Sequence, residues 1–570
     1  SFHVVDNDSY LSVDRLKHVH TFLSKDISSV ITETSPLDIA LASKKCLVGQ
    51  PVTLGKLKHG VLRIALGADM VNHIYRGTKT MTELVLEDAI IMRKLLLILN
   101  HWEPLCAKFI DIPVHHHLPA PPVKEANNSS SMWDFSVKDN QCGSALRALL
   151  TSGHELYPRM VMYDLDAVDI AFQTLVAPFP SHFDYRFNVS SCPLSFFLRR
   201  AIENDIGLTC SSVVEVQHAL RLGCAPHKIT FTSPVKTRRQ IAYSIDMGVE
   251  VNADSFEELD IIREHAQQLF QSNFPECTPR YAGELPRIGV RVHFTQQSDH
   301  AWMTGIPMTP ENRAKLVQLF KESPWLSGLV LATYVKGEDS LMHDIAAGAN
   351  LLCDLANEID AVVGETRVKV LNLGCGLEAH YDTDRVYPTF GEFVETLHAE
   401  APKIFERNGR TVLTEHGDYV SAKVGWTTSD VEHVRFHQVE STLDESRQTV
   451  VIDSGADVLT RLPNSTYKHR ISVYKDNGEP STATSTMQSI ACIGEPLHHE
   501  WSSRKVSLPL MERGDIVVLH DTGCNIGTMY HGANGQPAPP VYGYRRHNEK
   551  LHVVLLKPAE TPEQVMQLWG

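Results

Sequence analysis

Short apolar segments alternate with amphipathic helical patterns eight times between Phe183 and Glu415. The segments are rich in β-branched residues, as expected for parallel strands that are buried on both faces. Eight such units close into a (β/α)8 barrel, in which the chemistry lies on the loops after the strands. The predicted strands are Phe183–Val189, Ile206–Cys210, Lys228–Thr232, Val249–Ala253, Arg287–His293, Gly328–Thr333, Val368–Leu373 and Thr411–Glu415.

After Glu415 the pattern changes to alternating apolar and polar positions separated by turn residues. This pattern predicts an antiparallel β-domain. One further strand, Tyr157–Asp164, and a helix, Leu165–Leu175, are expected to lead into the barrel. The strands expected in the β-domain are Tyr419–Val424, Val434–Val439, Thr449–Asp453, Ile471–Tyr474, Ser489–Gly494, Asp515–His520 and Leu551–Leu556.

Residues 1–117 read as a separate, mainly helical extension. Its clearest helix follows a capping box at Thr80 and Glu83 and is apolar on most sides, so it needs apolar neighbours. Pro-Ala-Pro-Pro and Asn-Asn-Ser-Ser-Ser then indicate a flexible linker. We therefore expect an N-terminal extension (1–117), a linker (118–150), a barrel (151–418) and a β-domain (419–570).

Composition narrows the function classes. The net charge of -15 argues against a general binder of nucleic acids or anionic membranes, which needs clustered Lys and Arg. The longest apolar run is too short to span a membrane. The 11 cysteines are dispersed without a Cys-x-x-Cys pair, which indicates a reducing intracellular compartment, the cytoplasm first and the mitochondrion as the alternative. Three consecutive histidines, His115–His117, cannot all face one way on a strand, so we expect no metal site.

A series of motifs occurs in a characteristic order. They are Tyr157-Pro-Arg-Met-Val-Met-Tyr-Asp-Leu-Asp, Gly207-Leu-Thr-Cys-Ser-Ser, Ile229-Thr-Phe-Thr-Ser-Pro-Val-Lys, Leu371-Asn-Leu-Gly-Cys-Gly and Glu415-His-Gly-Asp-Tyr-Val-Ser-Ala. In this order they resemble the ornithine/diaminopimelate/arginine decarboxylase family, the alanine-racemase-like pyridoxal phosphate (PLP) enzymes of fold type III. Ornithine decarboxylases are the most similar. The resemblance covers roughly residues 155–570 and implies a barrel, a β-domain and a head-to-tail dimer.

The same resemblance implies a cofactor site that this sequence does not complete. The family places the lysine that holds PLP as a Schiff base at the end of the first barrel strand, where Ser190 stands here. The arginine that binds the phosphate is replaced by Asp418, whose carboxylate repels a phosphate. Gly374, Gly376 and Glu415, which serve the phosphate and the pyridine nitrogen in the family, are kept as vestigial cofactor-binding residues.

Other functional positions of the family are also changed. Thr209 replaces the acidic residue after strand two, and Ala332 replaces the histidine that stacks on the cofactor ring. Leu497 and His498 replace a Cys-Asp pair, and Asn525 a tyrosine, that family members send into the partner subunit's site.

These losses favour a catalytically degenerate decarboxylase fold, a pseudoenzyme without catalytic residues or cofactor. It would act as a scaffold, a regulatory partner or a subunit of an assembly, as a homodimer or as a heterodimer with an active paralogue. One alternative is a PLP decarboxylase that has moved its lysine to Lys336, with Lys236 structural. Another is an enzyme without PLP that uses Glu415, His416 and Asp418 for acid–base work in the same pocket.

Overall fold

The computed structural model describes most of the chain after residue 134. The described ranges are 135–154, 156–271, 287–294, 304–332, 341–374, 377, 379–381, 385–406, 408–439, 442–454, 469–492, 505–524, 536–547, 550–567 and 569. Contacts divide the chain into two compact units, Ser1–Pro119 with Ser212–Ile288, and Ala120–Ser211 with Gly289–Gly570. The expected N-terminal helices lie outside the described residues.

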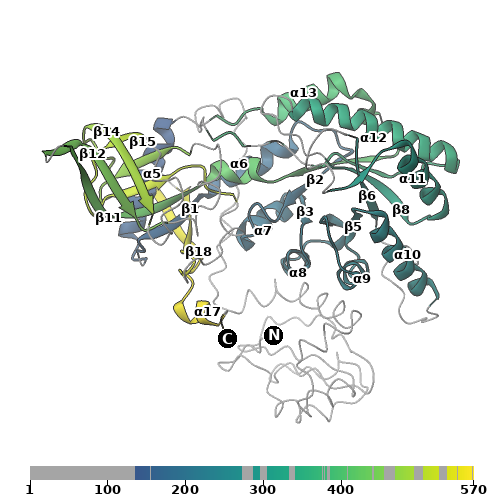
Figure 1. Ribbon diagram of the computed structural model, residues 1–570, viewed down its shortest axis with the longest axis horizontal. Helices are drawn as coiled ribbons and strands as arrows, with labels where there is room; N and C mark the ends of the chain where they lie inside the picture. The colour runs from purple at the N-terminus through teal and green to yellow at the C-terminus, as the bar shows by residue number, and fades with distance from the viewer. Residues whose placement is uncertain are drawn as a thin grey trace, which may run out of the picture. The chain divides into compact units, whose positions relative to one another are not determined.

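The predicted barrel is confirmed (Figure 1). Its sheet has the strand order β5-β4-β3-β2-β10-β9-β8-β6-β7 and closes through a pairing of β5 with β6. Each of the eight predicted strands coincides with one of the barrel strands, and β7 (Ile306–Pro307) is a short addition. The eight are β2 (Phe183–Asn188), β3 (Gly207–Cys210), β4 (Ile229–Thr232), β5 (Glu250–Ala253), β6 (Ile288–His293), β8 (Leu326–Leu331), β9 (Val370–Asn372) and β10 (Thr411–His416).

Helices alternate with these strands. In the first unit they are α8 (Val213–Arg221), α9 (Arg238–Asp246) and α10 (Phe256–Gln271). In the second they are α6 (Leu165–Val176), α7 (Ser195–Glu203), α11 (Pro310–Glu322), α12 (Leu341–Val363) and α13 (Phe390–Glu400). The ring of Phe172 on α6 packs at 5.7 Å from Phe187 of β2 and at 5.1 Å from Phe197 of α7. These aromatic contacts fix the outer, helix-facing side of β2.

A second sheet, with the order β15-β14-β12-β11-β1-β17-β18, forms the β-domain. β16 pairs with β11 and β13 off this path. β1 (Arg159–Asp164) belongs to this sheet rather than to the barrel, because it pairs antiparallel with β11 and parallel with β17. The other strands are β11 (Gly425–Val439), β12 (Thr442–Ile452), β13 (Ile471–Tyr474), β14 (Ser485–Cys492), β15 (Lys505–Pro509), β16 (Ile516–Leu519), β17 (Val541–His547) and β18 (Lys550–Lys557).

The linker does not extend to residue 150 as predicted, because residues 135–151 form helix α5 (Phe135–Thr151). Four of its residues recur at helical spacing and are buried: Cys142, Ala145, Leu146 and Leu149. They share one apolar cluster with residues of β1, β11 and β17. Helix α5 is therefore part of the core of the β-domain.

The strand predicted at Tyr419–Val424 is wrong. The segment forms a short helix, α14 (Asp418–Ser421), and a 3-10 turn, η6 (Ala422–Val424). The backbone N–H groups of Val420 and Ser421 both donate to the carbonyl of Gly417, at 3.0 and 3.2 Å, which turns the chain directly after β10. Its apolar residues Tyr419, Val420, Ala422 and Val424 are buried, but on a helical turn rather than on a strand. None of the helices in the described ranges is both long enough and apolar enough to cross a membrane.

Candidate functional site

Three neighbouring barrel strands bring the predicted site residues to one rim. β10 pairs in parallel with β2 on one side and with β9 on the other. The carboxyl ends of these strands therefore lie together, as in barrel enzymes generally. Ser190 follows β2, Gly374 follows β9 and Asp418 follows β10. The structure thus places the three on adjoining turns.

The turn after β2 is closed by its own side chains. Ser190 donates its hydroxyl to Asn188 Oδ1 at 2.8 Å, and its N–H donates to the same oxygen at 3.2 Å. Gly417 packs against this turn so closely that a Cβ there would lie 2.2 Å from the hydroxyl oxygen of Ser191. The turns that carry Ser190 and Asp418 are therefore in direct contact.

Glu415 is tied to the turn after β9. Its carboxylate accepts a hydrogen bond of 2.7 Å from the Asn372 amide, whose oxygen accepts the N–H of Gly374 at 2.8 Å. Gly374 has φ +73°, a conformation that side chains disfavour, which gives this glycine a structural reason to be kept. Burial raises the pKa of Glu415, while the Asn372 bond and the charges of Arg291 and Arg186 oppose that shift.

His416 lies on the opposite side of β10 from Glu415, as consecutive strand residues do. It is only 1% exposed, its Nε2 lies 3.0 Å from Thr414 Oγ1, and its ring packs edge-on against Phe390 of α13. Burial lowers its pKa to about 3. His416 is therefore a neutral core residue at physiological pH, and the structure does not gather Glu415, His416 and Asp418 into one acid–base group.

Sequence reasoning missed the charged residues inside the barrel. Arg186 on β2 is fully buried and forms an ion pair of 2.7 Å with Asp184, two residues earlier. It stands opposite Glu415 in the pairing of β2 with β10. The available signal was the alternation of polar with aromatic residues along β2, in Phe183, Asp184, Tyr185, Arg186, Phe187 and Asn188.

Of the remaining residues predicted for the site, some are buried and others lie outside the described ranges. Thr209 and Ala332 are buried at the ends of β3 and β8. Lys236 is buried and pairs with Glu258 at 2.7 Å, which agrees with the structural role expected for it. Five candidates lie outside the described residues: Gly376, Lys336, Leu497, His498 and Asn525.

Comparisons with known proteins identify similar chains. Residues 165–309 match the sequence model of the family described as pyridoxal-dependent decarboxylase, pyridoxal binding domain. The protein TabA of Pseudomonas amygdali pv. tabaci is 24% identical over 387 residues, 66% of this chain and 84% of that protein. The diaminopimelate decarboxylase of Campylobacter jejuni subsp. jejuni is 22% identical over 374 residues, 64% of this chain and 84% of that protein.

Solved structures share the fold. The diaminopimelate decarboxylase of Helicobacter pylori in complex with L-lysine aligns with a TM-score of 0.59 at 17% identity, covering 74% of this chain and 98% of that chain. The arginine decarboxylase of Paramecium bursaria Chlorella virus bound to agmatine aligns with a TM-score of 0.55 at 15% identity, covering 70% of this chain and 100% of that chain. The family resemblance read from the motifs is confirmed, whereas the particular similarity to ornithine decarboxylases stays a prediction.

Proposed function

Because the chain is a divergent member of the fold type III pyridoxal-dependent decarboxylase family, we propose that it is a pseudoenzyme. In this proposal the decarboxylase fold is kept as a scaffold, a regulatory partner or a subunit of an assembly. The turn after β2 supports it most strongly. There a serine hydroxyl, bonded to Asn188, stands where the resemblance implies the amine of a Schiff-base lysine.

The rim residues in the described part of the chain do not fit a covalently held PLP. A Schiff base needs a primary amine, and the hydroxyl of Ser190 is not one. Asp418 begins α14, on the turn that packs against the one holding Ser190. A carboxylate there repels a phosphate that the family's arginine would bind bidentately.

The retained residues have structural roles that do not need a cofactor. Glu415, Asn372 and Gly374 bond to one another and hold the turn after β9 against β10. Such a rim stays ordered after its chemistry is lost. A binding role then falls to the outer surfaces of the barrel and β-domain and to residues 1–134, with a second copy or an active paralogue as the first partners to consider.

The test is a decarboxylation assay on the purified full chain with PLP. Release of carbon dioxide is measured from diaminopimelate, ornithine and arginine, beside an active diaminopimelate decarboxylase as the positive control. We expect release at background level from all three. Release above background overturns the proposal, and its loss in Lys336→Ala then identifies a relocated lysine.

A further inference from the structure

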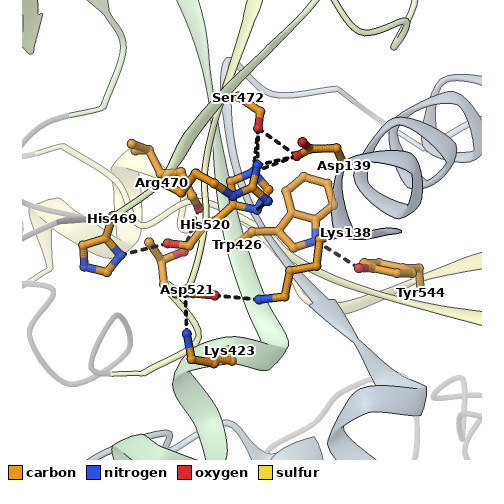
Figure 2. Close-up of polar contacts among 12 residues, drawn as sticks. Lys138, Asp139, Lys423, Trp426, His469, Arg470, Ser472, His520, Asp521 and Tyr544 are labelled. Atoms are coloured by element: carbon orange, nitrogen blue, oxygen red, sulfur yellow. Dashed lines mark hydrogen bonds and ion pairs between the residues drawn. The ribbon is translucent and has the colours of Figure 1, made fainter. Parts of the chain in front are cut away.

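One buried carboxylate, Asp521, joins three separate segments of the second unit (Figure 2). Its Oδ1 accepts Lys138 Nζ of α5 at 2.9 Å, and its Oδ2 accepts Lys423 Nζ of η6 at 3.0 Å. All three side chains are buried. We call these residues the Asp521 clamp. Lys423 follows α14, so the clamp is five residues from Asp418 at the barrel rim.

The charge of Asp521 in the clamp is stabilised by the charges of Lys138 and Lys423. Burial alone would raise the pKa of Asp521, but the two ammonium groups lower it to about 2, so the residue is a carboxylate at physiological pH. Removing one partner of a buried charged group is strongly destabilising, because the remaining charge is left without full compensation. Loss of the Lys138 charge therefore leaves the Asp521 carboxylate, and its pairing with Lys423, less well compensated.

The next residue of α5 strengthens the attachment. Asp139 forms an ion pair of 2.6 Å with Arg470 and accepts the hydroxyl of Ser472 at 2.8 Å. It also lies 3.4 Å from His520, the neighbour of Asp521. Asp521 itself has φ +58°, an unusual backbone conformation for a residue other than glycine. Two consecutive residues of α5 thus hold the turn at residues 520–521 in place.

The turn at residues 520–521 leads into Thr522 and Gly523, which pack against the segment that follows the barrel rim. Gly523 donates its N–H to the carbonyl of Ala422 at 2.9 Å, and Thr522 donates to Gly425 at 3.0 Å. A Cβ on Gly523 would lie 2.1 Å from the carbonyl oxygen of Ser421, so no side chain fits there. Contacts are therefore continuous from α5 through residues 521–524 to α14 and η6.

We propose that Lys138 is a positioning residue that couples helix α5 to the rim segment 417–424 through Asp521. A change in the order of helix α5 therefore changes the order of the rim segment. This coupling does not depend on whether the rim holds a cofactor, and it stands or falls separately from the proposed function.

Hydrogen exchange followed by mass spectrometry tests the coupling in the full chain. Lys138→Met removes the charge at nearly the same length, beside a small cavity lined by Gln141, Cys142 and Trp426. We expect exchange in peptides from 417–424 and 520–524 to become about tenfold faster, because a charge-assisted bond is lost. Peptides from β8 and β9 should not change.

Arg147→Met is the matched control. Arg147 also lies on α5 and also binds the β-domain, through Glu479 and the carbonyl of Gly478, both at 3.1 Å, but none of its hydrogen bonds in the described ranges reaches Lys138, Asp521 or Lys423. It should leave exchange in 417–424 unchanged. Lys138→Arg, which keeps the charge, should restore most of the protection.

Two outcomes overturn the proposal. One is Lys138→Met with faster exchange in α5 but wild-type exchange in 417–424, which would show that the coupling ends at the helix. The other is an equal effect of Arg147→Met on 417–424, which would show general loosening of α5. If Lys138→Met fails to fold, Lys138→Gln, which keeps a hydrogen-bond donor, is judged by the same peptides.

Discussion

The hydroxyl of Ser190 is bonded to Asn188 Oδ1 at 2.8 Å, so the side chain at the end of β2 is satisfied within its own turn. A Schiff-base lysine at this place would have to present a primary amine to a ligand at the barrel rim. If the proposed function is right, restoring a PLP site at this rim requires more than a single replacement.

The first prediction concerns that restoration. Ser190→Lys supplies an amine but leaves Asp418 near the phosphate position. Two like unit charges about 5 Å apart repel by roughly 3 kcal/mol at an effective dielectric of 20, which is about a hundredfold in affinity. Ser190→Lys with Asp418→Arg should therefore bind PLP about a hundredfold more tightly than Ser190→Lys alone, measured by absorbance titration. Equal affinities would place Asp418 away from the phosphate.

The second prediction concerns the pH dependence of stability that the buried His416 of β10 causes. Burial lowers the pKa of His416 to about 3 in the folded state, against about 6.5 when unfolded. The unfolded chain therefore binds the additional proton between these values. The contribution of His416 to stability is complete above pH 6.5 and is lost as the pH falls towards 3. The loss reaches at most about 3 kcal/mol at pH 4.

His416→Phe removes this titration. It should lower stability slightly at pH 8, where the contact with Thr414 is lost, and raise it relative to wild type near pH 4. Urea unfolding at several pH values measures the difference, and the same substitution at the exposed His398 is the control. Parallel pH profiles for wild type and His416→Phe would contradict the assignment of His416 as a buried neutral residue.

The third prediction separates helix α5 from the region before it. Leu146 and Leu149 of α5 are buried, and their burial is worth roughly 5 kcal/mol together, comparable to the whole stability of many domains. Deleting residues 1–134 should leave a folded barrel and β-domain, whereas deleting residues 1–151 should not. Circular dichroism and thermal unfolding compare the two truncations.

The same pair of truncations tests the role expected for the N-terminal extension. Removal of residues 1–134 should abolish a native association seen by size-exclusion chromatography or pull-down, while the remaining chain stays soluble. Aggregation of that truncation would instead make the extension part of the folded core. An unchanged association would place the interface on the barrel or the β-domain.

Local patterns explain which parts of the fold were predictable. The eight barrel strands are short, mostly buried segments, many of them with β-branched residues, and each is recognisable without knowledge of its neighbours. The partners of β1 are not, because Arg159 pairs with Ser429, some 270 residues away, and no periodicity records that register. Helix α5 was hidden by the linker composition before it and by Gly143 and Ser144 within it.

At the barrel rim, too, the features set by local sequence were predictable and those set by strand pairing were not. The motifs placed Ser190 and Asp418 directly after β2 and β10, where the structure has them, while their roles stay predictions. The bond between Asn372 and Glu415 depends on the pairing of β9 with β10 and was not predictable from either residue alone. The Asp521 clamp was missed for a related reason, since Lys138, Lys423 and Asp521 come from distant segments. Arg186 is different, because its partner Asp184 is only two residues away and the alternation along β2 was overlooked.

The most direct measurement is borohydride trapping of PLP on the full chain. The protein is incubated with PLP, scanned for the visible absorption band of an imine, reduced with borohydride and digested for peptide mass spectrometry. An active diaminopimelate decarboxylase treated in parallel should yield one stoichiometric pyridoxyl-lysine. We predict no such band for this chain and only trace labelling scattered over exposed lysines. A single stoichiometric pyridoxyl-lysine, at Lys336 or at any other barrel position, would contradict it.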